Sequence, residues 1–490
     1  MSPRRLRTVG LVLSASVVLV ACVFGFVATR PRHTTAPLNL ASPTATVPPT
    51  PSPTPGLPGN DWTQYRYDIA GTGDNPEDLI STADAPGLAT RWLVGAMFSG
   101  HAFESSPAVY HGTVYITNGN SLFAFDLRTG KYRWQFDVAP PTNLPQISSS
   151  VAIDPSTDIA YFGTPDARVL AVSLTTHQQV WQVTLGAASQ GAYIWSSPLL
   201  VNGLVYFGLA SHNDHPCVRG AAFALDPATG HTVWVHYVVT PDRLGGGVWS
   251  SMTADPDEDA ILVTTGNPCD GPEDVPVEGG ATRADENAVL ALNWNTGATL
   301  WRYTAISTDF GEDLDFGEGA VVFSVSGQKY VVAGNKQGTV YALNPPAAAG
   351  GAPHLAWSQT LSTSGAFPNG GIFTPPTYHN GVIYEAGGPT PDGVCQQGAL
   401  FALNAASGAV LWRQCTAGQV VSPPSYTGGV LFVGQHMSVV AYNAATGKVL
   451  WQGAINGDVY GGVTVSHGIV LLGTVTGASR LYAFALPVTT

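Results

Sequence analysis

The stretch SSPAVYHGTVYITNGNSLFAFDLRTGKYRW, residues 105–134, decides the fold. His111-Gly112 and Thr129-Gly130 are turn signals, because glycine adopts positive φ without steric cost. The segments between the turns are short and rich in β-branched and aromatic residues, which favour strands. The stretch therefore predicts three short strands and the start of a fourth, joined by tight turns.

This pattern recurs along almost the whole chain, which is the signature of a repeat architecture. Full copies span residues 105–134, 148–181, 195–234, 249–301, 317–357, 371–412 and 422–451, and a last copy of three strands runs from about 461 to 486. Each full copy closes on a tryptophan, and an eighth such tryptophan, Trp92, precedes the first copy. The strand around Trp92 is the one that the last copy lacks. We therefore predict an all-β, eight-bladed β-propeller over residues 60–490, closed into a ring by an N-terminal strand.

Composition agrees with a protein built from strands and turns. Charged residues make up only 11% of the chain, beside 56 glycines and 37 prolines. The net charge of −13 argues against a nucleic-acid partner, because phosphate binding needs clustered Lys and Arg. We expect a compact, monomeric protein that lies outside the cytoplasm.

The N-terminal region, residues 1–32, predicts a route out of the cytoplasm. Arginines precede an uncharged apolar segment, 9–28, that is long enough to span a bilayer. Leu19-Val20-Ala21-Cys22 also resembles a bacterial lipobox, in which Cys22 would be lipidated, and ordinary cleavage of a signal peptide is a third reading. Residues 33–59 are rich in Pro and Thr, which predicts an extended linker. All three readings place the propeller outside the cytoplasm, and the first two tether it to the membrane.

The four remaining cysteines predict two disulfides in an oxidising compartment. Cys217 and Cys269 each follow the second strand of adjacent copies, while Cys395 and Cys415 follow the second and fourth strands of one copy. We expect the pairs Cys217–Cys269 and Cys395–Cys415, although four cysteines allow three pairings.

The motif Ser-Pro-x-Val … Gly-x-Val-Tyr … Leu-x-Ala-Leu-Asp-x-x-Thr-Gly-x-x-x-Trp resembles the pyrroloquinoline quinone (PQQ) repeat, from about residue 61 to the C-terminus. The resemblance implies the eight-bladed propeller of quinoprotein alcohol dehydrogenases. The same repeat also builds an outer-membrane assembly propeller, which binds protein and has no cofactor. Fold alone therefore does not decide function.

The fourth and fifth copies look most like polyvinyl-alcohol dehydrogenase. The resemblance implies that Trp249 stacks on the quinone, that Asn267 binds calcium, that Asp315 is the general base and a calcium ligand, and that Lys336 contacts the quinone carbonyls. Taken singly, each also fits a structural role. Trp195, for example, occupies the position of Trp249 in the preceding copy.

The third copy departs from the family. The family's calcium-binding glutamate would fall near His215, where this chain has Asp214 as the nearest carboxylate, and Arg219 follows as a further expected cofactor contact. Two functions stay open. One is a PQQ- and Ca²⁺-dependent dehydrogenase that oxidises a small alcohol or sugar. The other is a non-catalytic propeller that binds a cell-envelope protein.

Overall fold

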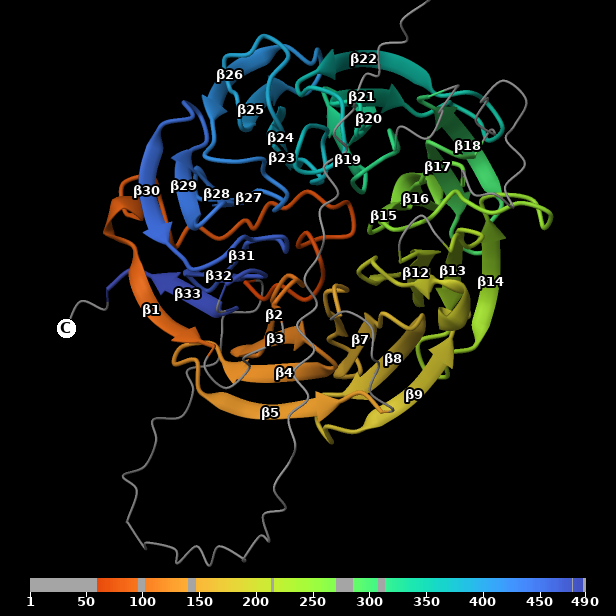
Figure 1. Ribbon diagram of the computed structural model, residues 1–490, viewed down its shortest axis with the longest axis horizontal. Coiled ribbons are helices and arrows are strands. Elements are labelled where there is room, and N and C mark those ends of the chain that lie inside the picture. The colour runs from red at the N-terminus through yellow and green to blue at the C-terminus, as the bar shows by residue number, and fades with distance from the viewer. Residues whose placement is uncertain are drawn as a thin grey trace, which may run out of the picture. The chain divides into compact units, whose positions relative to one another are not determined.

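The computed structural model describes residues 60–95, 102–139, 147–212, 216–269, 285–306, 313–477 and 479–487. These residues form eight antiparallel sheets that stand as blades around a ring (Figure 1). Seven blades consist of four consecutive strands that run outward from the centre in chain order. In blade 3 the short strand β10 (Ala192–Tyr193) also pairs with β12. The predicted eight-bladed, all-β propeller is confirmed.

The strands of each blade have the following bounds. Blade 1 contains β2 (Ala108–Tyr110), β3 (Thr113–Asn118), β4 (Ser121–Asp126) and β5 (Tyr132–Asp137); blade 2, β6 (Ala152–Asp154), β7 (Ile159–Gly163), β8 (Arg168–Ser173) and β9 (Gln179–Thr184); blade 3, β11 (Leu199–Val201), β12 (Leu204–Ser211), β13 (Ala221–Leu225) and β14 (Thr232–Tyr237); blade 4, β15 (Thr253–Asp255), β16 (Ala260–Thr264), β17 (Ala288–Asn293) and β18 (Thr299–Thr304). Blade 5 contains β19 (Val321–Val325), β20 (Gln328–Gly334), β21 (Thr339–Asn344) and β22 (His354–Thr360); blade 6, β23 (Thr377–His379), β24 (Val382–Gly387), β25 (Ala399–Asn404) and β26 (Val410–Cys415); blade 7, β27 (Ser425–Thr427), β28 (Val430–Gln435), β29 (Ser438–Asn443) and β30 (Val449–Ala454); blade 8, β31 (Thr464–Ser466), β32 (Ile469–Gly473) and β33 (Leu481–Ala485). The described residues also form three short 3₁₀ helices, one ahead of β1 at Ala85–Gly87 and two between strands at Ala188–Gln190 and Pro256–Glu258.

The ring closes through β1 (Ala89–Val94), which supplies the outermost strand of blade 8. β1 pairs antiparallel with β33, and Trp92 lies opposite Ala483. The prediction that the strand around Trp92 completes the last blade is therefore confirmed. Because β1 pairs with β33, blade 8 has the same four strands as the other blades and no free edge at this position.

The hydrophobic core is divided among the interfaces between blades. Eight buried clusters each join side chains from two neighbouring blades, and together they run around the whole ring. Middle strands are buried on both faces, as in β28, because a blade is covered on each side. Outermost strands such as β5 alternate between exposed and partly buried residues instead.

Several closing tryptophans form a hydrogen bond to the next blade. Trp234 of blade 3 donates its indole N–H to the carbonyl oxygen of Trp294 in blade 4 at 2.9 Å. Its ring covers Gly297, where a Cβ atom would lie 2.6 Å from the ring. Trp92 repeats the arrangement over Gly130. At these positions the closing tryptophan of one blade thus covers the glycine of the Thr-Gly turn in the next blade.

A segment ahead of β1, residues 60–78, runs along the innermost strands inside the ring; we call it the inner segment (Figure 1). Its backbone exchanges hydrogen bonds with Val109 of blade 1 and accepts one from Ile153 of blade 2. Further bonds come from the amides of Ala254, Val322, Tyr378 and Tyr426, in blades 4, 5, 6 and 7. The Asn75 side chain donates to the carbonyl oxygen of Val465 in blade 8. The inner segment therefore forms hydrogen bonds with innermost strands, on the edges that face the centre of the ring.

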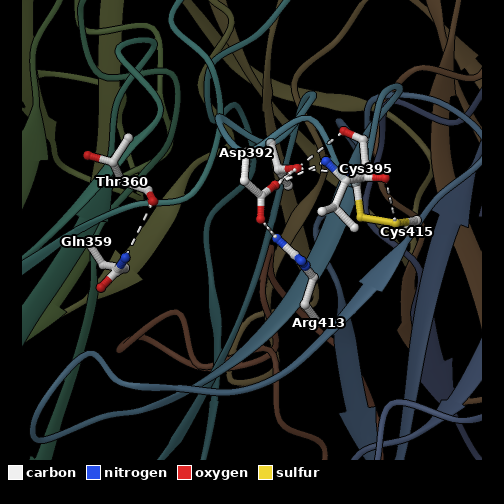
Figure 2. Close-up of polar contacts among 8 residues, drawn as sticks. Gln359, Thr360, Asp392, Cys395, Arg413 and Cys415 are labelled. Atoms are coloured by element: carbon white, nitrogen blue, oxygen red, sulfur yellow. Dashed lines mark hydrogen bonds and ion pairs between the residues drawn. A yellow bond between two sulfur atoms is a disulfide. The ribbon is translucent and has the colours of Figure 1, made fainter.

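Both predicted disulfides are present. Cys217–Cys269 joins blades 3 and 4 with the two Cα atoms 6.3 Å apart. Cys395–Cys415 lies within blade 6, where Asp392 beside it forms an ion pair with Arg413 (Figure 2). The pairing chosen among the three alternatives is confirmed.

The predicted membrane anchor, Cys22 and the Pro/Thr-rich linker, residues 33–59, lie outside the described residues. Among the residues that the structure does describe, no helix is long and apolar enough to cross a membrane.

Candidate functional site

Three residues lead into the innermost strand of every blade, and we call them the lead-in triplet. The eight triplets are residues 104–106, 148–150, 195–197, 249–251, 317–319, 373–375, 421–423 and 460–462. The third residue of several triplets links neighbouring blades. The Ser106 amide donates to the Ser150 hydroxyl at 2.9 Å, the Ser150 amide to Ser197 at 3.1 Å, and the Ser197 amide to Ser251 at 2.9 Å. The Ser-Ser motif thus holds the centre of the ring together.

The first residues of the triplets line a cavity at the centre of the ring. Its volume is about 160 Å³, and all eight first positions contribute: Glu104, Ser148, Trp195, Trp249, Gly317, Phe373, Val421 and Tyr460. Tyr65 of the inner segment and Glu318 also line it. Several aromatic rings beside a few polar groups are typical of a small-molecule site.

Trp249, Asp315 and Lys336, which the sequence predicted as site residues, contact one another, and of the three Trp249 lines this cavity. The Trp249 indole N–H donates to Oδ2 of Asp315 at 3.0 Å. The Lys336 ammonium lies 2.6 Å from Oδ1 of Asp315 and 2.5 Å from Oδ1 of Asp313. It also lies 4.9 Å from the centre of the Trp249 ring, within range of a cation–π interaction.

Local backbone contacts fix this group. The amide of Lys336 donates to the carbonyl oxygen of Asp315 at 2.9 Å, so the turn after β20 is bonded to the loop before β19. Asp315 is 1% exposed and Lys336 is 7% exposed. Two neighbouring blades therefore hold a carboxylate, an indole and an ammonium in contact.

Burial sets the proton affinity of the pair. Desolvation raises the pKa of Asp315 to about 6, although the Lys336 charge and hydrogen bonds oppose the rise. Desolvation alone would lower the pKa of Lys336, but attraction to Asp315 and Asp313 outweighs it and raises that pKa. Near neutral pH the site therefore contains an ionised carboxylate whose proton affinity suits a general base.

Asn267, the predicted calcium ligand, directly follows a residue that contacts Asp315. A Cβ atom on the preceding residue, Gly266, would lie 3.0 Å from Oδ2 of Asp315. The backbone carbonyl of Asn267 accepts the Gly246 amide at 2.9 Å. An amide oxygen and a carboxylate in adjacent positions are ligands that Ca²⁺ accepts. The flat Trp249 ring, the Lys336 cation and these oxygens fit a quinone with a divalent cation.

The remaining predicted site residues are placed differently. The Arg219 guanidinium lies 3.7 Å from the centre of the Tyr237 ring and donates to the carbonyl oxygen of Val239. It is not among the described residues that line the cavity, so its cofactor role stays a prediction. Asp214 lies outside the described residues. Within the described ranges, no three His, Cys, Asp or Glu side chains gather where they could hold a metal.

Sequence reasoning missed Glu104, Phe373 and Tyr460 as cavity residues. Their position could have identified them, because each is the first residue of a lead-in triplet, as Trp195 and Trp249 are. It also missed Arg66, Glu318 and Glu385, which are buried together although they lie far apart in the chain.

Comparisons with known proteins agree with this class of propeller. A family model described as "Glucose/ethanol/alcohol dehydrogenase, beta-propeller domain" matches residues 62–353, more than half of the chain. The chain therefore belongs to the PQQ-repeat propeller family. A second model, described as "Outer membrane protein assembly factor BamB", matches residues 336–466 and 396–486.

Individual relatives are distant. The chain is 25% identical over 288 residues to the quinohemoprotein alcohol dehydrogenase ADH IIB of Pseudomonas putida, which covers 53% of this chain and 41% of the relative. It is 24% identical over 327 residues to the polyvinylalcohol dehydrogenase of a Pseudomonas species, which covers 58% of this chain and 49% of the relative. The chain thus spans less than half of the length of these relatives.

Solved structures share the fold. A europium-containing methanol dehydrogenase superposes with a TM-score of 0.73 at 17% identity and covers 87% of this chain and 98% of its own. The quinohemoprotein alcohol dehydrogenase of Comamonas testosteroni gives 0.71 at 18% identity, with 88% and 81% covered. BamB from Moraxella catarrhalis gives 0.56 at 15% identity, with 81% and 99% covered.

Proposed function

We propose that the protein is a PQQ-dependent dehydrogenase that oxidises a small alcohol or sugar. The observation that carries the proposal is the mutual contact of Trp249, Asp315 and Lys336 in a family propeller whose central cavity Trp249 lines. Bound PQQ with Ca²⁺ would supply the hydride acceptor and a Lewis acid. Relatives that oxidise alcohols support this assignment.

Residues of the chain itself would supply the general base, a positive charge, an apolar wall and ligands for the calcium ion. Asp315 accepts the hydroxyl proton of the substrate, because its carboxylate is ionised above a pKa of about 6. Lys336 places a positive charge where negative charge develops on the acceptor. The Trp249 ring gives the cavity a flat apolar wall. Asn267 and Asp315 are the oxygen ligands available to the calcium ion.

We further propose that the propeller works outside the cytoplasm as a monomer, tethered by residues 1–32 or released by cleavage. The two disulfides support an oxidising compartment. The basic N-terminus followed by the apolar segment 9–28 supports export.

The test is titration of PQQ and Ca²⁺ into the propeller by calorimetry, followed by dye-linked oxidation of alcohols and sugars. We expect Asp315→Asn to retain PQQ binding while kcat falls about 100-fold or more, because the base is lost. Trp249→Ala should weaken PQQ binding more than Trp195→Ala, its matched control in the neighbouring blade. Failure of the wild-type protein to bind PQQ, or full activity of Asp315→Asn, would refute the proposal.

A second function, a protein-binding scaffold, is favoured by one observation. The BamB model matches two overlapping stretches of blades 5 to 8, 336–466 and 396–486. Saturable binding of a purified envelope protein by a propeller that does not take up PQQ would decide for the scaffold.

A further inference from the structure

The second residue of the lead-in triplet makes the same hydrogen bond in blades 1, 2 and 3. Its side chain accepts a hydrogen bond from one amide on the second strand of its own blade. Ser105 accepts from Thr117 at 3.2 Å, Ser149 from Gly163 at 3.0 Å, and Ser196 from Gly208 at 2.8 Å. These amides occupy the same register position in the three blades.

Blade 5 replaces this serine with Glu318. One carboxylate oxygen, Oε1, takes over the serine's task and accepts from the amide of Gly334. The other oxygen, Oε2, is inaccessible to solvent and has no hydrogen-bond partner. The residue is 1% exposed. The substitution therefore fixes the carboxylate and leaves one oxygen free to take a ligand.

Blade 6 departs from the pattern in another way. The equivalent amide, that of Ala386, donates to Oε1 of Glu385 at 2.9 Å, and not to Thr374 in the triplet. The Thr374 hydroxyl, which by register points at the same amide, is left without a partner, as is Oε2 of Glu385. Both residues are 0% exposed. Thr374 and Glu385 thus present two unpartnered oxygens at one place.

Glu318 and Glu385 meet at the interface between blades 5 and 6. A Cβ atom on Gly334 would touch both Glu318 and Ile372 of blade 6. On β24, Ile383 packs toward blade 5 and Tyr384 toward blade 7, so the alternation of the strand turns Glu385 toward blade 5. Burial and the charge of Glu385 raise the pKa of Glu318 well above its usual value.

One positive charge is already present. Arg66 of the inner segment is 3% exposed and donates to the carbonyl oxygens of Pro376 and Pro424 and to the Thr377 hydroxyl. Its attraction to Glu318 and Glu385 offsets part of the cost of burying it. With both carboxyl groups ionised, the two carboxylates and the guanidinium would carry a net charge of −1 in an enclosed space. Burial raises the pKa of both Glu318 and Glu385 well above the usual value, because an uncompensated buried charge is costly, so either a bound proton or a further cation must balance the group.

We propose that Glu318, Glu385 and Thr374 form a buried site for one small monovalent cation, of the Na⁺ or K⁺ class. A single positive charge balances the group, whereas a divalent ion would leave an excess and needs six to eight oxygens in the case of Ca²⁺. Glu318 is among the residues that line the central cavity, so the site lies beside that cavity. The site is separate from Asn267 and Asp315 and does not depend on the proposed dehydrogenase activity.

The test is the thermal stability of the propeller in NaCl, KCl or RbCl, with ionic strength held constant by tetramethylammonium chloride, a cation too large for the site. We expect a saturable rise in Tm of about 2–4 °C. Glu318→Gln and Glu385→Gln should abolish the rise. Glu104→Gln, which changes a carboxylate in the same cavity outside the proposed site, should keep it.

A second measurement needs no variant. Crystals of the wild-type protein grown in RbCl should show an anomalous peak between the carboxylates of Glu318 and Glu385. A Tm that is indifferent to the small cations, together with no peak, would overturn the proposal and indicate that a shared proton balances the group. An equal rise in Glu318→Gln would overturn it as well.

Discussion

Replacing Asp315 with asparagine should stabilise the protein at alkaline pH. Desolvation raises the pKa of this carboxyl from its ordinary value of 3.8 to about 6 in the folded state. The folded state therefore binds the proton more tightly than the unfolded state does. The stability that this group contributes is fully present below pH 3.8 and is lost as the pH rises through about 6. The difference between the two pKa values corresponds to about 3 kcal/mol.

Asparagine approximates the protonated carboxyl, because it is neutral and its carbonyl oxygen still accepts from the Trp249 indole. Lys336 keeps its contact with Asp313. In denaturant unfolding, we expect Asp315→Asn to exceed the wild type by about 3 kcal/mol at about pH 8 and to match it at about pH 4. Asp313→Asn is the control, because that side chain is 32% exposed and should show a much smaller gain. A variant less stable than the wild type at alkaline pH, or a difference independent of pH, would contradict the reasoning.

Two further predictions concern the scaffold. Gly297→Ala should lower the free energy of unfolding by more than Gly203→Ala, by about 1–3 kcal/mol, because the new Cβ would lie 2.6 Å from the Trp234 ring, whereas Gly203 has a similar φ of +70° and nothing within 4 Å. Equal losses in denaturant titrations would show that backbone strain alone matters. Cys395→Ser, which opens the bond to Cys415 across a separation of 20 residues, should cost about 3 kcal/mol by the same measurement; an unchanged unfolding midpoint would argue against a stabilising role.

The sequence predicted the ring because its blades are copies of one another. Eight closing tryptophans and a last copy with only three strands fixed both the number of blades and the role of the strand around Trp92. It did not predict what each tryptophan covers. That contact joins Trp234 to Gly297 across a blade boundary, and a pattern within one copy does not contain it.

The candidate site was predicted where this chain matches the family's residues at family spacing, as at Trp249, Asp315 and Lys336. The group of Arg66, Glu318 and Glu385 was not, because no local pattern connects the inner segment with blades 5 and 6. Glu318 was visible only as one acid in an acidic loop. Its burial follows from its position in the lead-in triplet, which becomes apparent once the strands are in register.

The inner segment also determines how the ring would respond to mechanical force. It is bonded to one blade after another, first to Val109 and Ile153 and later to Tyr426. Tension on the chain ahead of Trp62 would load these contacts one after another. Only after the last of them would the load reach β1 and the paired edge of blade 8. The inner segment would therefore extend and absorb mechanical work before the pairing of β1 with β33, which closes the propeller, is strained.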